Sequence, residues 1–301
     1  VKYFKPLRKL SVHSKINCVK FSPDGHKIVS ALDDGTVQIW QIAENMEDQS
    51  TCKQLEGHTN KVKGAQFSPD GNMIVSCSAD NTIRLWDVQS GKEIKTLTGH
   101  SSKVRASQFS ADGKNILSIS KDNTIRIWDV KSGQMLSKIE RNTNIHDIHF
   151  SSNGQICFST ISSNPPSTVF IISDARSGEK IKEFVGHSSR VVYAQFSPDL
   201  QSIVSCANES SFRIWDVGSN VAEDIAQGDN CRVNYVLFSP DGKTIVSCSG
   251  SAIYLWDVRV KMETQILKKH TRDITLLDIS PDGNTIVSAS KDKTIRIWER
   301  L

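Results

Sequence analysis

Short runs of apolar and small residues alternate with turn-forming residues along the chain. One run extends from Met73 to Ser78, a turn follows at Asp80, and the next run ends at Trp86. Runs of this length that are rich in Ile, Val and Thr and bounded by Gly, Pro, Asn and Asp are typical of strands. The periodicity of an amphipathic helix is absent. The pattern therefore predicts an all-β chain in which each unit of the pattern contains four short strands.

The pattern repeats with a mean period of 43 residues. Each of the six Trp follows an Ile or Leu, and Ser173 occupies a seventh equivalent position. These positions are 40, 86, 128, 173, 215, 256 and 298. A fixed period of this length is typical of repeat architectures. We therefore expect residues 1–301 to form a single domain of seven similar units.

A second string keeps the same period and marks a turn. It reads Phe-Ser-Pro-Asp-Gly or a close variant, and it begins at positions 21, 67, 109, 150, 196, 238 and 279. Pro sets φ at the first corner of such a turn, and Gly accepts positive φ. Leu200 stands where the fifth unit would have the Gly. The string is expected to connect the first and second strands of each unit.

Two dipeptides complete the pattern and carry a family resemblance. Gly-His precedes the first strand at 57, 99 and 186, and Trp-Asp follows the third strand at 86, 128, 215 and 256. With four strands per unit, this arrangement resembles the WD-repeat β-propeller family. The resemblance implies a seven-bladed β-propeller with four-stranded antiparallel blades. The last unit ends after its third strand, so a strand at about residues 5–10 is expected to complete the last blade and close the ring.

The resemblance also implies a structural role for the recurring polar residues. In this family a loop His, a strand Ser or Thr, a turn Asp and the Trp indole form a hydrogen-bonded chain within each blade, which satisfies the buried indole N–H. The sets expected here are His13, Asp34 and Trp40 with Ser30; His58, Asp80 and Trp86 with Ser76 or Ser78; His100, Asp122 and Trp128 with Ser118; and His270, Asp292 and Trp298 with Ser288.

Three units depart from this pattern. The fourth has Arg141 in place of His and Ser173 in place of Trp, and a 162–167 loop replaces its Asp turn. The fifth has Glu209 in place of Asp. The sixth has Asp229 in place of His, and its turn near Gly250 is one residue short. We expect these three blades to be less rigid than the others.

Composition and cysteine usage narrow the class of protein. Apolar residues make up 38% and charged residues 23% of the chain, and no apolar run is long enough to span a membrane. The seven Cys are scattered without C-x-x-C pairs, which favours a reducing compartment. Cys77, Cys206 and Cys248 are expected to be buried and unreactive. These features predict an intracellular, cytoplasmic protein with the nucleus left open, and the start at Val1 leaves open that a longer protein contains this chain.

Charge at the repeat positions predicts a binding surface. In WD-repeat proteins partners commonly bind the top face, and three positions in each blade point there. At these positions stand nine cations, against only Asp33 and Asp273, whereas the whole chain carries a net charge of +4. The cations are Lys15, Lys61, Lys63, Lys103, Arg105, Lys121, Arg190, Arg232 and Lys291. Such segregation favours an acidic or phosphorylated partner, although a solvated basic rim would have the same composition.

The function class follows from these features. No nucleophile elbow, phosphate-binding loop or metal motif is present, so we expect a non-catalytic scaffold for protein–protein interaction without cofactor or metal. The top-face positions hold no aromatic residue, which disfavours a methyl-lysine cage and base stacking, and makes nucleic acid an unlikely partner. The domain is expected to be a monomer that does not bind membranes.

One short motif supports an alternative function. Trp256-Asp257-Val258-Arg259 is similar to the box by which some WD-repeat substrate receptors dock on the adaptor of a cullin-type ubiquitin ligase. A catalytic site in the channel, or a role as the repeat region of a larger regulatory protein, are further alternatives. The identity of the partner, the face that binds it and the role of the fourth blade are left open by the sequence.

Overall fold

The computed structural model describes residues 3–42, 52–140, 144–150, 156–162, 168–174, 179–226 and 232–301. All regular structure in these ranges is β-strand, and none of them contains a helix long and apolar enough to cross a membrane. Arg141, residues 163–167 and Asp229, which figure in the expectations for the fourth and sixth units, lie outside the described residues.

The chain divides into two compact units, and each is described by itself. The first unit contains Val1–Val12 and Thr143–Leu301, and the second contains His13–Asn142. All strand pairs in both units are antiparallel.

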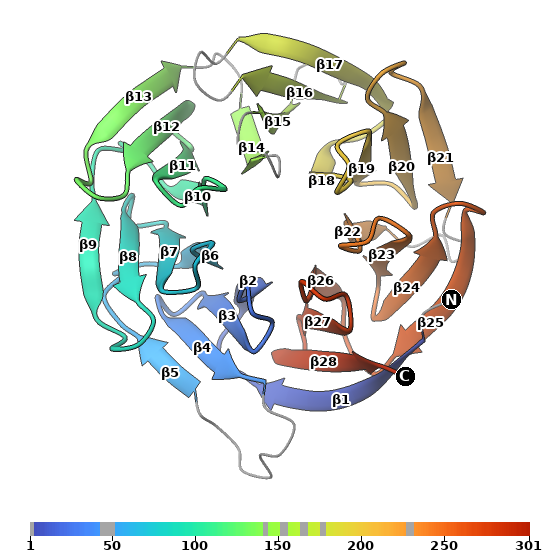
Figure 1. Cartoon of the computed structure of the whole chain (residues 1–301), viewed down its shortest axis with the longest axis horizontal. Coiled ribbons are helices and arrows are strands. Elements are labelled where there is room, and N and C mark those ends of the chain that lie inside the picture. The colour runs from blue at the N-terminus through green and yellow to red at the C-terminus, as the bar shows by residue number, and fades with distance from the viewer. Residues whose placement is uncertain are drawn as a thin grey trace. The chain divides into compact units, whose positions relative to one another are not determined.

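The His13–Asn142 unit contains three four-stranded sheets, in each of which neighbouring strands are consecutive in sequence (Figure 1). Their strands are β2 (Ile16–Phe21), β3 (Lys27–Leu32), β4 (Val37–Gln41) and β5 (Cys52–Leu55); β6 (Val62–Phe67), β7 (Met73–Ser78), β8 (Ile83–Asp87) and β9 (Glu93–Leu97); and β10 (Val104–Phe109), β11 (Asn115–Ser120), β12 (Thr124–Asp129) and β13 (Met135–Glu140).

The other unit contains four four-stranded sheets. Three of them are β14 (Asn144–Phe150), β15 (Ile156–Ser162), β16 (Thr168–Asp174) and β17 (Lys180–His187); β18 (Val191–Phe196), β19 (Ser202–Ala207), β20 (Ser211–Asp216) and β21 (Ala222–Ala226); and β22 (Val233–Phe238), β23 (Thr244–Ser249), β24 (Ala252–Asp257) and β25 (Met262–Lys268). The last sheet joins the two ends of the chain and has the order β1 (Phe4–Ser11), β28 (Thr294–Arg300), β27 (Thr285–Ser290) and β26 (Ile274–Ile279).

The N-terminal strand is thus the fourth strand of the sheet that ends the chain. It pairs with β28 from Phe4 opposite Arg300 to Ser11 opposite Thr294. Phe4 is 5% exposed, and the Gln265 side chain bonds its backbone N–H and carbonyl oxygen, both at 2.8 Å. These contacts hold the first residues of the strand in place.

Burial differs from strand to strand for a reason visible in the sequence. The second strands, such as β7, are buried at five consecutive positions because both faces of the strand are covered, so they require small or apolar residues throughout. The fourth strands, such as β13, are mostly exposed and carry charged residues, as edge strands commonly do. Between neighbouring sheets the core is apolar, as where Val29 and Leu55 of one sheet form a cluster with Ile74 and Trp86 of the next.

The Pro-Asp-Gly turns have the predicted backbone. Gly71 has a φ of 74° and its N–H bonds the Ser68 carbonyl at 2.9 Å. The Asp70 carboxylate accepts hydrogen bonds from Ser68 Oγ at 2.5 Å and from Asn72 N at 3.1 Å, and these bonds lower the pKa of Asp70. Leu200 adopts the same conformation with a φ of 61°, which is strained for a residue with a Cβ.

Candidate functional site

Six cations lie at one end of the three sheets in the His13–Asn142 unit. Three directly precede the first strands, two are the second residues of first strands, and the sixth directly follows β11. The six are called the basic end, and they are Lys15, Lys61, Lys63, Lys103, Arg105 and Lys121. Of the top-face positions, these are the ones that the structure brings together in this unit.

Backbone pairing explains why these residues share one end. The first and second strands of each sheet are antiparallel, so the start of one lies beside the end of the other. The Asp33 N–H donates to the Lys15 carbonyl, the Ala79 N–H to the Lys61 carbonyl and the Lys121 N–H to the Lys103 carbonyl, each at 2.9 Å. The same positions therefore recur in each sheet, as the repeat spacing predicted.

A side-chain contact joins the first two sheets at this end. Asn17 Nδ2 donates to the Val62 carbonyl of β6 and to Asp33 Oδ1, each at 2.8 Å. Asn234 makes the equivalent contact with the Ile274 carbonyl at 2.9 Å in the other unit. The repeated Asn was a signal in the sequence, but its role in connecting sheets was not predicted.

Asp33 is the carboxylate that pairs with the basic end. Lys61 Nζ lies 2.6 Å from Asp33 Oδ2, and Lys63 Nζ lies 3.8 Å from Asp33 Oδ1. Burial would raise the pKa of Asp33, but hydrogen bonds from Lys61 and Asn17 and the charge of Lys63 lower it. Asp33 is therefore ionised at neutral pH, and its negative charge offsets part of the positive charge of Lys61 and Lys63.

The charges of neighbouring cations at the basic end affect the pKa of Lys63. Burial lowers the pKa of its ammonium group, the charge of Asp33 opposes this, and repulsion from Lys15, Lys61 and Lys103 lowers the pKa further. Since Lys103 belongs to the third sheet, the basic end is one electrostatic cluster across all three sheets of the unit.

In the other unit the equivalent positions carry less net charge. Arg190 precedes β18 and Arg232 precedes β22, and both are exposed. Burial lowers the pKa of Arg190, and repulsion from Arg232 adds to this. Lys291 pairs with Asp273 at 2.7 Å. These three cations and one carboxylate leave a surplus of two positive charges, compared with five at the basic end once Asp33 is counted.

The recurring His residues form the expected chains of hydrogen bonds. Trp86 Nε1 donates to Ser76 Oγ at 2.7 Å, Ser76 Oγ lies 2.8 Å from His58 Nε2, and His58 Nδ1 lies 2.8 Å from Asp80 Oδ2. The carboxylate places the ring proton on Nδ1, so Ser76 donates to Nε2. The sequence left Ser76 and Ser78 as alternatives; Ser78 instead bonds the Asn60 carbonyl at 3.0 Å.

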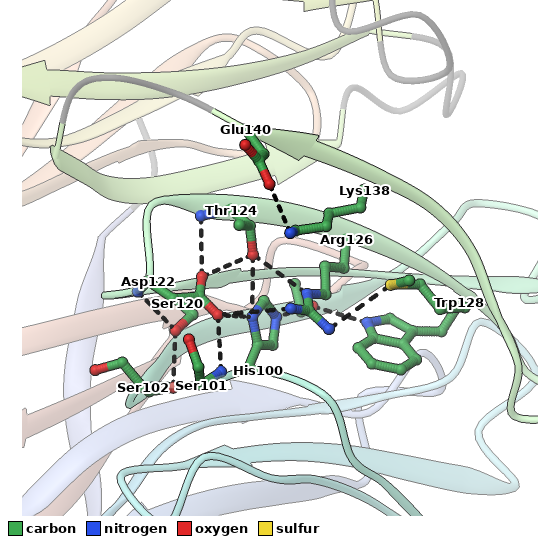
Figure 2. A network of polar contacts seen from close by, with 12 residues as sticks. His100, Ser101, Ser102, Ser120, Asp122, Thr124, Arg126, Trp128, Lys138 and Glu140 are labelled. Atoms are coloured by element: carbon green, nitrogen blue, oxygen red, sulfur yellow. Dashed lines mark hydrogen bonds and ion pairs between the residues drawn. The ribbon is translucent and has the colours of Figure 1, made fainter.

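Equivalent chains are present in two further sheets. They contain His100, Ser118, Asp122 and Trp128, and His270, Ser288, Asp292 and Trp298. Figure 2 shows the Asp122 carboxylate between His100 and Thr124, whose hydroxyl donates to Asp122 Oδ1 at 2.7 Å. The role of this Thr, two residues after the Asp in each complete set, was missed although the residue recurs in the sequence. Burial lowers the pKa of His100 and His270, so both rings are neutral at neutral pH.

The remaining sets differ from this arrangement. Trp40 Nε1 donates to Ser30 Oγ at 3.0 Å, but the His13 side chain is exposed, whereas His58 is buried. The separation of His13 from Asp34 is one residue shorter than that of His58 from Asp80, which shifts the ring outward. In the fifth unit the longer Glu209 side chain lies 3.3 Å from His187 Nδ1 and accepts a bond from Ser189 N at 2.8 Å.

A model of the WD domain, G-beta repeat (WD40), matches six segments of the chain. They are residues 4–41, 49–87, 91–129, 178–216, 224–257 and 261–299. The chain belongs to the WD40 repeat family. It is an all-β propeller protein with four-stranded antiparallel blades. A search of curated proteins found no match.

Membership of the WD40 family indicates a protein-interaction scaffold, since WD40 propellers are generally non-catalytic. Residues 130–177, between two matched segments, contain Ser173, which stands where the other units have Trp. Ser173 is buried on β16. Among the described residues, no group of three or more His, Cys, Asp or Glu side chains is arranged to hold a metal ion. The buried Cys77, Cys206 and Cys248 occupy the same position in three second strands, as expected.

The Trp-Asp-x-Arg segment of this WD40 chain closes a turn. Asp257 Oδ1 accepts hydrogen bonds from Arg259 N at 2.9 Å and from Val260 N at 3.1 Å. Trp256 is buried, and its indole donates to Ser247 Oγ at 2.9 Å. The Arg259 side chain is exposed.

Proposed function

We propose that this WD40 chain is a non-catalytic scaffold whose basic end binds acidic or phosphorylated segments of other proteins. The observation that carries the proposal is that Lys61 and Lys63 share the carboxylate of Asp33, while Lys15, Lys61 and Lys103 lie close enough to Lys63 to repel its ammonium group. Holding like charges close together costs free energy, and an anionic partner recovers it.

Charge and side-chain chemistry favour this class of partner. Lysine ammonium groups on flexible side chains bind carboxylate and phosphate oxygens as point charges. The side chains of Lys15, Lys61, Lys103 and Lys121 are exposed, so a partner can reach them. The basic end contains no aromatic residue, which disfavours recognition of nucleic acid by base stacking. We place the scaffold in the cytoplasm on the basis of its seven scattered cysteines, which form no C-x-x-C pair.

Matched triple variants test the proposal. The test variant changes Lys15, Lys61 and Lys103 to Gln. The control changes Lys92, Lys114 and Lys131 to Gln; these exposed lysines lie in turns at the opposite end of the sheets β6–β9 and β10–β13. Both variants remove three positive charges from one unit.

The measurement is binding to arrayed acidic, phosphorylated and unmodified peptides at low and moderate salt. The test variant should lose affinity for anionic peptides on the order of 100-fold at low salt, while the control changes little. Thermal unfolding should be unaffected in both. Equal loss in the two variants would show that only net charge matters, and would contradict a binding surface at the basic end.

We also infer that the sheets are the blades of one seven-bladed ring that the N-terminal strand closes. The inference is supported by the seven four-stranded sheets and by the pairing of β1 with β28. Deleting residues 1–11 should uncover the edge of β28 and cause self-association, because an unpaired strand edge recruits other chains. Size-exclusion chromatography that finds the shortened chain monomeric and equally stable would contradict this closure.

A second candidate function is that of substrate receptor of a cullin-type ubiquitin ligase, docking through Trp256-Asp257-Val258-Arg259. It is supported by the exposed Arg259 side chain on a turn that Asp257 holds in place. Arg259→Ala should then abolish capture of the ligase adaptor in a pull-down, while Lys131→Ala, in the similar turn after Trp128, should not. Failure of the intact chain to capture the adaptor, beside an established receptor as control, would remove this candidate.

A further inference from the structure

We propose that the basic end selects a phosphate dianion on a protein segment over a single carboxylate, and that Asp33 is a built-in competitor occupying Lys61 and Lys63 in the unbound protein. The proposal rests on the proposed function and names both its ligand class and a residue that sets its affinity. It is argued within the His13–Asn142 unit alone.

Asp33 is held firmly at the centre of the cluster. Both carboxylate oxygens are used: Oδ1 faces Asn17 Nδ2 at 2.8 Å and Lys63 Nζ at 3.8 Å, and Oδ2 faces Lys61 Nζ at 2.6 Å. The side chain is 19% exposed, and Asn17 is itself tied to the Val62 carbonyl. The carboxylate is therefore bound to the basic end as a ligand carboxylate would be.

The positive charges of Lys15, Lys103 and Lys121 are less compensated by carboxylates than those of Lys61 and Lys63. In the described part of the chain, no carboxylate lies within ion-pair distance of Lys15, Lys103 or Lys121. Lys15 and Lys103 are nonetheless close enough to Lys63 to lower the pKa of its ammonium group. After Asp33 is counted, the basic end keeps five positive charges.

This arrangement treats the two kinds of anion differently. Either anion must compete with Asp33 for Lys61 and Lys63, and Asp33 is present at an effective concentration of about millimolar or higher. A phosphorylated side chain carries about −1.5 to −2 charges and three acceptor oxygens. It can contact Lys63 together with Lys15 or Lys103, and its attraction to the surplus charge is up to about twice as large.

Lys61 can also exchange partners. Its side chain is 51% exposed, so the ammonium group can leave Asp33 for an arriving phosphate without unpacking the core. Asp33 then stays anchored by Asn17 and repels the ligand. Asp33 thus lowers affinity for every anion, and by the larger factor for the dianion.

The experiment uses the full chain and three peptides that differ at one position, which is phosphoserine, Glu or Ser. The test variant is Asp33→Asn. The control is Asp70→Asn, which removes the same charge at the far end of β6, about 20 Å away by the rise of a strand. Dissociation constants are measured by isothermal titration calorimetry at about 0.1 M ionic strength, where the screening length is about 10 Å, and thermal unfolding confirms that both variants fold.

In the unchanged chain, phosphoserine should bind at least about tenfold more tightly than Glu. Asp33→Asn should tighten the phosphoserine peptide about tenfold and the Glu peptide about threefold, because the repulsion removed scales with ligand charge. Asp70→Asn should change neither, since the distance exceeds the screening length.

Several outcomes would overturn the inference. Equal affinity for phosphoserine and Glu would remove the dianion preference. Unchanged or weaker binding in Asp33→Asn would show that Asp33 does not compete with the ligand. Binding of anionic vesicles without binding of any phosphopeptide would assign the surface to membranes. If no anionic peptide binds the chain or either variant, the proposed function itself fails, which distinguishes that failure from failure of the inference alone.

Discussion

The sheets β6–β9 and β18–β21 contain the same chain of Trp, Ser and His, but a different acid ends each chain. Asp80 accepts bonds from His58, from Thr59 N and from both the N–H and the hydroxyl of Thr82. Glu209 contacts His187 at 3.3 Å and otherwise bonds the loop residues Ser188 and Ser189. One added methylene thus moves the acid from the strand turn to the preceding loop. The Asp80 carboxylate bonds both the loop before β6 and its own turn at Thr82, whereas the bonds of the Glu209 carboxylate go to His187 and the loop before β18.

The strongest way to test this comparison is to remove each acid. Asp80→Ala leaves the His58 ring N–H and two turn N–H groups without their acceptor in a nearly buried site, and should cost about 3 kcal/mol of unfolding free energy. Glu209→Ala should cost about 1 kcal/mol, because the Glu209 side chain is more exposed than that of Asp80 (14% against 7%) and its contact with His187 is longer, at 3.3 Å. Urea unfolding of both variants gives the two values, and equal losses would contradict the comparison.

Lowering the pH should remove the stability contributions of the His and Asp residues in two different pH ranges. Burial lowers the pKa of His100, His187 and His270, so the unfolded chain takes up protons first and stability falls as pH drops below about 6.5. Burial would raise the pKa of Asp122, but hydrogen bonds from Thr124 and His100 lower it to about 2. Its contribution, on the order of 2 kcal/mol, is present above about pH 4 and is lost as pH falls toward 2.

The measurement for this prediction is thermal unfolding, followed by Trp fluorescence between pH 8 and pH 3. Stability should decrease in two stages, and Asp122→Asn should make the decrease below pH 4 shallower, because it removes one titrating carboxylate. A melting temperature that stays constant from pH 7 to pH 4.5 would contradict the assignment of neutral, buried His rings.

The smallest expected effect is a repair of the sheet with Glu. Leu200 has a φ of 61° in the turn where the sheet β6–β9 has Gly71, and this conformation costs a residue with a Cβ about 1 kcal/mol. Leu200→Gly should raise the unfolding free energy by about 0.5 kcal/mol, since the greater freedom of Gly in the unfolded chain offsets part of the gain. Gly71→Leu should be destabilising in the same assay, and a loss of stability in Leu200→Gly would mean that packing of the Leu side chain outweighs the strain.

Repeat spacing predicted most of the local structure. The run from Met73 to Ser78 is β7 without a shift at either end, and Gly71 has the positive φ that its turn requires. The His, Asp and Trp of a complete set were also predictable, because their separations within one sheet are constant. The choice of Ser76 over Ser78 was not, since alternate residues of a strand buried on both faces look alike in sequence.

The side-chain contacts of the candidate site could not be predicted from the sequence. Lys61 and Lys63 were predicted to share a face, but their pairing with Asp33 links residues of two sheets. The exposed position of His13 depends on one missing residue before β2, whose effect on the ring could not be derived from spacing alone.

The sequence by itself determined the strands and the turns, because these depend on distances along one repeat and on local backbone preferences, and the family resemblance implied the His, Asp and Trp of the three complete chains. The tertiary structure alone decided which charges meet. Sheet packing brings Lys15 and Lys103, from two other repeats, close to Lys63 and places Asp33 beside it. Electrostatic energy depends on separation in space, and that separation is set by how neighbouring sheets pack.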